Sequence, residues 1–128
     1  MTTGHVDLIH RQIKGLNRGD WEASIEGMSP DVEWWVAREH PAARTIHGLE
    51  ELRSYREDWA QSLGELTYEL EEALDNDDVV VVIGKVRGIV AGSRTEVEVP
   101  LALVVEFRGE DVVKVEKYLD PQEARRAA

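Results

Sequence analysis

Residues 5–35 read HVDLIHRQIKGLNRGDWEASIEGMSPDVEWW. Apolar residues recur there at the spacing of one helix face, which predicts a helix over about 6–16 with a stripe of Val6, Ile9, Ile13 and Leu16. Gly19 then breaks the chain, and Asp20 can cap a short helix over 21–28. Pro30 and Asp31 end that segment. The Trp- and Val-rich residues 32–37 favour a strand that follows it.

A third helix is predicted over residues 49–63, after Gly48. One face of this helix is apolar and consists of Leu49, Leu52, Tyr55, Trp59 and Leu63, while Glu50, Arg53 and Glu57 lie on the other. Residues 38–47, between the strand and this helix, are polar and include Pro41, which favours a loop at a rim.

From Leu66 the hydrophobic period changes to two. Strands are predicted from Leu66 to about 74 and over 79–90, 95–107 and 112–119, with turns at 75–78, 91–93 and 108–111. The short connections indicate a meander of antiparallel neighbours. Asp120, Pro121 and Glu123 then have the spacing of a capping box, which predicts a closing helix from Pro121 to about Arg126.

The order of these elements predicts one α+β domain over residues 1–128. Its sheet would be strongly curved, mixed but mainly antiparallel, and wrapped round three helices from the N-terminal half. With 128 residues, 42% of them hydrophobic, the chain can bury a sufficient core. Such a cone-shaped arrangement leaves room for an internal pocket.

Composition excludes several classes of function. The formal net charge is −11 and the basic residues are scattered, which argues against nucleic acid and anionic membranes as partners. There is no cysteine, so disulfides, thiolate nucleophiles and cysteine-ligated zinc are excluded. The longest apolar run, residues 79–83, is too short to span a bilayer, and no export signal is visible. A cytoplasmic location is therefore expected.

No metal site is predicted. The four histidines, His5, His10, His40 and His47, do not pair at i,i+4 on a helix, and no carboxylate is spaced to complete a metal triad. His40 and His47 flank the expected rim loop, where either could meet a substrate.

Several short motifs resemble one known family. These are LNRGDW at residues 16–21, PDVE at 30–33, IHGL at 46–49, and YLD at 118–120 before a Glu-Ala helix. They resemble the SnoaL-like family of the nuclear transport factor 2-like (NTF2-like, cystatin-like) superfamily, which includes polyketide cyclases, ketosteroid isomerases and limonene epoxide hydrolases. The resemblance covers nearly the whole chain and implies the cone fold, a homodimer and a cofactor-independent reaction on a small molecule.

Catalytic residues of these enzymes are mostly replaced. By the resemblance, the proton-shuttling Asp of ketosteroid isomerases falls at Val36, their oxyanion-binding Tyr at Gln12, and the assisting Asp at or beside Leu103. The Asp-Arg-Asp set of limonene epoxide hydrolases falls at Gly84, Val86 and Lys117. Valine and leucine carry no proton, so neither mechanism is available in its usual form. The acid that cyclases use for enolisation has no clear counterpart here.

Strand parity and the resemblance together define the expected pocket. The odd residues of the last strand, Val113, Val115, Lys117 and Leu119, are expected to face inward. We predict a pocket for a small apolar molecule, lined by Gln12, Trp34, Val36, Tyr55, Trp59, Val86, Leu101, Leu103 and Leu119. The alternative for these side chains is that they simply fill the core.

Lys117 is the candidate catalytic residue. An inward lysine between apolar neighbours would be desolvated, its pKa would fall, and it could act as a base or Schiff-base amine. The alternatives are a lysine that extends to the mouth of the cone, a salt bridge, or a one-residue register slip that turns it to solvent. Gln12 could hydrogen-bond either a ligand carbonyl or a backbone group. Asp120 is interpreted as a helix cap rather than a catalytic acid.

Three functions fit this pattern. The first is a cofactor-independent isomerase, cyclase or hydrolase acting on an apolar or polycyclic carbonyl compound in an aromatic-lined pocket. The second is a non-catalytic binding module with the same pocket, and the third is an interaction domain whose cone is filled by side chains. The strands over 79–119 carry valine on both faces, which predicts a homodimer through the outer face of the sheet.

Overall fold

The structure, a computed structural model, describes residues 2–36, 44–90 and 92–127, with side chains described there except at positions 2, 3, 44, 59, 60 and 62–65. Two helices, α1 (Thr2–Arg18) and α2 (Trp21–Ser24), precede strands β1 (Met28–Val36) and β2 (Arg44–His47). Helix α3 (Gly48–Ser62) leads into β3 (Leu63–Asn76), β4 (Val79–Val90), β5 (Glu96–Arg108) and β6 (Asp111–Tyr118), and α4 (Pro121–Ala127) follows.

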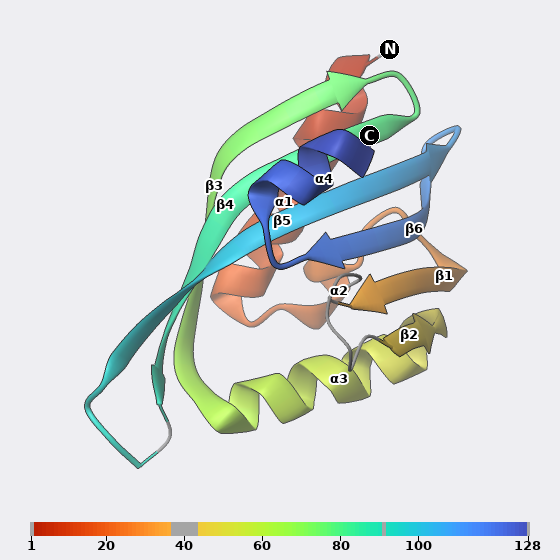
Figure 1. Cartoon of the computed structure of the whole chain (residues 1–128). Coiled ribbons are helices and arrows are strands. Elements are labelled where there is room, and N and C mark those ends of the chain that lie inside the picture. Colours follow the sequence, from red (N-terminus) through yellow and green to blue (C-terminus); the bar gives the residue numbers. More distant parts are fainter. Residues whose placement is uncertain (1, 37–43, 91, 128) are drawn as a thin grey trace.

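The six strands form one sheet in the order β2-β1-β6-β5-β4-β3. The pairs β3–β4, β4–β5, β5–β6 and β1–β2 are antiparallel, whereas β1 and β6 run parallel. Figure 1 shows β3, β4 and β5 bending strongly along their length, with α1 and α3 on the inner side of the bend and α4 on the opposite face. The predicted α+β fold with a curved, mixed and mainly antiparallel sheet is therefore confirmed.

The core fills the concave side of the sheet. Its buried residues come from α1, α3 and the inward faces of five strands, among them Leu8, Ile9, Leu52, Val80, Val82, Val105, Phe107 and Val115. A smaller cluster on the convex side joins Val81, Ile83, Ala102 and Val104 to Ala124 of α4. The valines on both faces of β4 and β5 are explained by these two layers, since α4 covers part of the outer face.

Two of the expected elements differ from the structure. Residues 38–47 were expected to be a loop, but Arg44–His47 form β2, which pairs with the end of β1 through contacts such as Trp34↔Ile46. The short helix expected over 21–28 ends at Ser24, and the chain turns so that β1 already begins at Met28. Pro30 therefore lies inside a strand, where β1 shifts register against β6 between Met28 and Glu33.

The last strand also departs from simple alternation. A register shift between Glu106 and Phe107 of β5 lets Phe107 pair with Val112 of β6, while Glu106 pairs with Lys114. Val112 is consequently fully buried in the core, and Val113 is only partly buried. The expected inward position of Val113 is therefore wrong, because this β-bulge adds one residue to the alternation.

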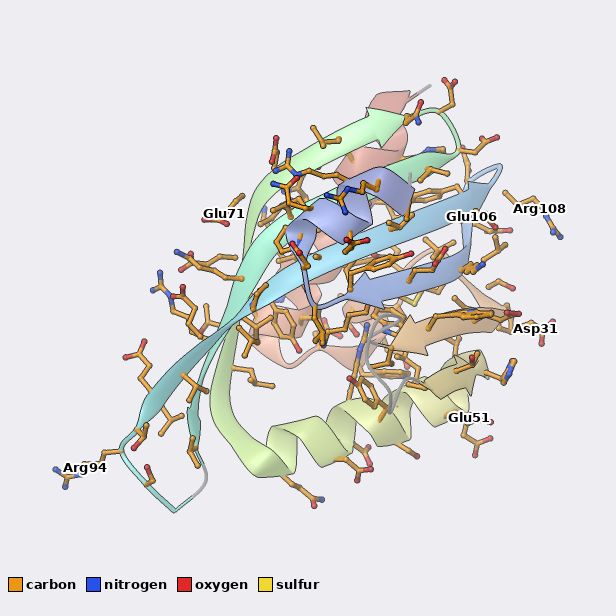
Figure 2. The ribbon with its side chains drawn as sticks, viewed as in Figure 1. Asp31, Glu51, Glu71, Arg94, Glu106 and Arg108 are labelled. Carbon is orange, nitrogen blue, oxygen red and sulfur yellow. The ribbon has the colours of Figure 1, made fainter. Side chains whose placement is uncertain are left out.

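The acidic surplus lies on the surface. Figure 2 shows the side chains of Asp31, Glu51, Glu71 and Glu106 directed away from the body of the molecule, and all four are exposed. No helix in the described part of the chain is long and apolar enough to cross a membrane.

Candidate functional site

A tight corner between α1 and α2 forms one wall of the site. Gly15 allows it, since a Cβ atom there would lie 2.6 Å from the backbone nitrogen of Ser24. Asp20 caps α2, because its side chain accepts a hydrogen bond from the backbone N–H of Ala23. Gly15, directly before the LNRGDW motif, thus sets how closely the two helices approach, and Asp20 of the motif caps the second helix.

Asn17 joins this corner to the edge strand β3. Its side-chain amide donates to the carbonyl oxygen of Tyr68 at 2.9 Å and accepts from the Tyr68 backbone N–H at 2.7 Å. The amide therefore replaces a neighbouring strand at this position. Pairing of this kind fixes β3 against α1 and holds the Tyr68 side chain beside the corner.

A cavity of about 490 Å³ opens between the α1–α2 corner, α3 and β3. Its wall includes Leu16, Trp21, Arg53, Arg56, Leu66 and Tyr68. A smaller hollow of about 30 Å³ lies deeper, against the concave face of the sheet, and is lined by Gln12, Trp34, Val82, Leu103 and Val115 among others. Both are also lined by Leu16, Ser24 and Arg56, so Arg56 stands between the outer cavity and the inner hollow.

Arg56 extends from α3 and is only partly exposed. One of its terminal nitrogens, Nη1, donates to Ser24 Oγ at 3.1 Å, and Ser24 Oγ itself donates to the carbonyl oxygen of Trp21 at 2.7 Å. The guanidinium lies over two indole rings, 5.4 Å from the centroid of Trp34 and 5.6 Å from that of Trp21. Burial lowers the pKa of Arg56 to about 10, which leaves it charged at neutral pH.

Two further donors accompany Arg56. Trp34 Nε1 is buried and has no hydrogen-bond partner among the residues that the structure describes. Burial raises the pKa of Tyr68, an effect that the nearby positive charge of Arg56 opposes. Its phenol is therefore protonated at neutral pH and can donate a hydrogen bond into the outer cavity.

Gln12, Trp34 and Leu103 are the predicted pocket residues that line the inner hollow. The side-chain nitrogen of Gln12 donates to the backbone carbonyl of Glu26 at 2.7 Å. The amide nitrogen of Gln12 thus hydrogen-bonds a backbone group, which is the second of the two alternatives given for this residue.

The other predicted pocket residues lie elsewhere. Val86 and Leu101 are packed in the core, and Val36 is partly buried against it. Tyr55 packs on the core from α3 and also borders a separate surface hollow beside Glu51 and Asp58. Leu119 follows the end of β6 and is 48% exposed. The side chain of Trp59 lies outside the described residues.

Lys117 lies on the concave side of the sheet. It pairs with Leu103 across the β5–β6 ladder and follows Val115 by two residues, and both of these neighbours line the inner hollow. The side chain is partly exposed. Burial lowers the pKa of Lys117 to about 8, which is the direction expected for a lysine among apolar groups.

Asp120 acts as a helix cap. Its Oδ1 accepts a hydrogen bond from the backbone N–H of Gln122 at 2.9 Å, and its carbonyl oxygen accepts from Glu123 and Ala124. The Glu123 carboxylate pairs with Arg126 at 2.6 Å.

We expect Asp120→Asn to change the free energy of unfolding by less than about 0.5 kcal/mol, because asparagine caps helices as well as aspartate does, whereas Asp120→Ala should cost about 1 kcal/mol. Urea denaturation measures both. Any ligand binding or activity should survive in Asp120→Asn. Loss of activity in a normally folded variant would show that Asp120 is a catalytic acid and not only a helix cap.

Among the described side chains, no group of three or more His, Asp or Glu is arranged to hold a metal ion. His5 instead joins the start of α1 to two hairpin turns. Its ring stacks on Phe107 with centroids 3.9 Å apart, and its nitrogens face the carbonyl oxygens of Asp77 and Gly109. His40 lies outside the described residues.

Sequence reasoning missed Arg56. It follows Leu52 by four residues and Leu49 by seven, which is the spacing of the apolar face of α3. A charged residue at such a position is the signal that could have identified it.

Comparisons with known proteins agree with this fold. The model of the SnoaL-like domain family matches residues 9–115, and the chain therefore belongs to this family. An uncharacterized protein of Mycobacterium tuberculosis strain H37Rv is 29% identical over 119 residues, which are 91% of this chain and 89% of that protein.

Solved structures with the same fold share less sequence. An NTF2-like protein of unknown function from Burkholderia pseudomallei K96243 has a TM-score of 0.81 at 18% identity, covering 96% of this chain and 95% of that one. A candidate SnoaL-like polyketide cyclase from Jannaschia sp. CCS1 has a TM-score of 0.80 at 18% identity, with 98% and 92% covered. These similarities confirm the NTF2-like fold that the resemblance implied.

Proposed function

We propose that this chain binds a small, flat apolar or polycyclic carbonyl compound in the cavity beside the α1–α2 corner, and acts on it as a cofactor-independent isomerase, cyclase or hydrolase. The cavity is the observation that supports this best. Its volume of about 490 Å³ is typical of ligand pockets, which combine an apolar wall with a few convergent polar groups. Here Leu16, Trp21 and Leu66 supply apolar wall, and Arg56 and Tyr68 supply polar groups. Trp34 lines the inner hollow behind Arg56.

In this proposal Lys117 is the base. With a pKa of about 8, about a tenth of Lys117 is neutral at pH 7. A neutral amine can take a proton from the carbon next to a carbonyl group, and the resulting enolate needs hydrogen-bond donors near its oxygen. The guanidinium of Arg56 and the indole N–H of Trp34 are such donors.

Thermal-shift and tryptophan-fluorescence titrations with steroid-like enones and polyketide-like aromatic ketones test the binding step. A ligand present at 100 times its dissociation constant should stabilise the protein by about 2.7 kcal/mol. Trp34→Phe removes one indole from the hollow and should reduce the quenching, while Trp35→Phe, on the opposite face of β1, serves as its control. A full panel that neither shifts the melting temperature nor quenches fluorescence would contradict the proposal.

A non-catalytic binding module is the second candidate. It is favoured by one observation: the described residues that line the inner hollow include no carboxylate and no histidine. Progress curves with a compound that binds decide between the two. Turnover by the wild type that Lys117→Met abolishes without loss of affinity supports the enzyme, and binding without turnover supports the module.

We further propose that the protein forms a homodimer through the part of the outer sheet face that α4 leaves uncovered. Leu74, which pairs with Val81 beside the smaller convex cluster, is 38% exposed there. Sedimentation velocity at micromolar concentration should give a dimer, and Leu74→Lys should weaken it. A clean monomer would contradict this prediction. The cytoplasmic location stays a prediction from the sequence.

A further inference from the structure

We propose that the ligand of this cavity carries an anionic oxygen group, a carboxylate or an enolate, and that the guanidinium of Arg56 binds it. The inference rests on the proposed function, because it names the chemical class of ligand for the same cavity.

The first argument is the missing counter-charge of Arg56. Other arginines pair with acids, as in Arg11–Glu26 at 2.9 Å, Arg87–Glu69 at 3.1 Å and Arg125–Glu72 at 2.6 Å. In the part of the chain that the structure describes, Arg56 has no carboxylate within 4.0 Å, and its hydrogen bond goes to the neutral hydroxyl of Ser24. Charged groups removed from water are normally paired. The chain has 26 acidic residues. Two of them, Asp20 and Glu57, also line the outer cavity, but they pair with Arg18 and Arg53 rather than with Arg56.

The second argument is the excess of donors around Arg56. A guanidinium has five N–H groups, and Ser24 accepts from one of its nitrogens. Trp34 Nε1 also lacks an acceptor among the described residues, and the Tyr68 phenol stays protonated. A buried donor without an acceptor costs about 1–3 kcal/mol. A ligand that brings acceptor oxygens would remove these costs, and an anionic oxygen does so best because charge-assisted hydrogen bonds are the stronger ones.

The third argument is that the guanidinium is held in place before a ligand arrives. Ser24 fixes Nη1, and the indole rings of Trp34 and Trp21 lie on the guanidinium at 5.4 and 5.6 Å. Binding therefore needs little ordering of this long side chain, which favours affinity. Because Arg56 lines both the outer cavity and the inner hollow, an anion bound to it would leave the apolar body of the ligand in the outer cavity.

Matched pairs of ligands test the inference. Isothermal titration at pH 7 would compare 2-naphthoate with 2-naphthamide, and anthracene-2-carboxylate with its amide, on the wild-type protein. Each pair has the same flat apolar body and differs in the charge of its oxygen group. We expect each carboxylate to bind about tenfold more tightly than its amide, or better, as hydrogen bonds to a charged group allow.

Three variants locate the effect. Arg56→Met should weaken carboxylate binding to the level of the amide and change amide binding by less than about twofold. Arg56→Lys keeps the charge but loses the fork of donors, so an intermediate affinity is expected. Arg94→Met is the control, because it removes the same charge at the tip of the β4–β5 hairpin. Figure 2 shows Arg94 directed into solvent there. This variant should bind both ligands like the wild type.

The outcomes separate the two proposals. Equal affinity of the wild type for carboxylates and amides would overturn the role of Arg56 and leave the small-molecule pocket standing. Binding of neither class would overturn both. If near-ultraviolet circular dichroism shows that Arg56→Met is unfolded, the wild-type pairs and Arg56→Lys still decide the question.

Discussion

Gly84→Ala is expected to destabilise the protein by about 3 kcal/mol or more, at the upper end of the cost of overpacking a core. A Cβ atom at Gly84 would overlap the carbonyl oxygen of Glu69 and lie 3.2 Å from the Cα atom of Leu70. Both contacts are backbone, so no side-chain rotation can relieve them. Gly84 stands opposite the bulge of β3 between Leu70 and Glu72, where the sheet bends over its own concave face.

Urea denaturation and thermal melting measure this effect, and for a chain of this size the melting temperature should fall by about 10 °C. Gly4→Ala is the control. It lies in α1, nothing lies within 4 Å of its added Cβ atom, and alanine there should be neutral or stabilise by up to about 1 kcal/mol. A Gly84→Ala protein that melts like the wild type would show that the bend does not depend on this close approach.

Lys117→Met is expected to stabilise the protein by about 2–3 kcal/mol at pH 7, whether or not it abolishes an activity. Folding lowers the pKa of Lys117 from 10.5 to about 8 because burial disfavours the charged amine. Each pKa unit corresponds to about 1.4 kcal/mol. Methionine has similar length and apolar bulk and carries no charge, so it keeps the packing and removes this cost.

The gain should depend on pH in a defined direction. Below pH 8 the amine is charged in both states, and the whole cost of burying it opposes folding. Between pH 8 and 10.5 the unfolded state binds more protons than the folded state, so the stability of the wild type rises relative to the variant. The difference between the two proteins should therefore be largest at pH 7 and small above pH 10.5.

Urea denaturation at pH 7 and pH 10.5 gives both values. Lys114→Met, on the same strand, is the matched control. Lys114 lies 3.7 Å from Glu116 and 4.8 Å from the centroid of the Trp35 ring, so its replacement should change stability little at either pH. A Lys117→Met protein less stable than the wild type at pH 7 would contradict the desolvation argument.

Local patterns predicted most of the fold. Hydrophobic periodicity located α1, α3 and the four strands from β3 to β6 within a few residues, because each element buries one regular face. Strand β2 was missed because it has only four residues and follows a polar stretch with a proline. Such a short segment shows no clear alternation of apolar and polar residues. The bulge that buries Val112 in place of Val113 was also missed. It depends on the register between β5 and β6, which a single strand does not encode.

The site was less accessible to sequence reasoning than the fold. Gln12, Trp34 and Leu103 were predicted and line the inner hollow, because helix and strand parity selects inward positions. Parity does not distinguish a residue that lines a hollow from one that is packed, which is why Val86 and Leu101 are core residues instead. Arg56 could not be placed in the site from sequence alone, because a charged residue on the apolar face of a helix can also extend its head group to solvent.

The parallel pairing of β1 with β6 sets the order in which the chain can be completed during translation. Trp34 lies beside Val115, so about 80 residues must be synthesised after β1 before its partner exists. At about 5–20 residues per second, β1 waits on the order of 4–16 s with its apolar side chains uncovered by β6. The hairpins from β3 to β5 can form in that interval, because they pair with their sequence neighbours. Strand β1 can also pair early with β2, so folding in the cell should end, rather than begin, with the pairing of β1 and β6.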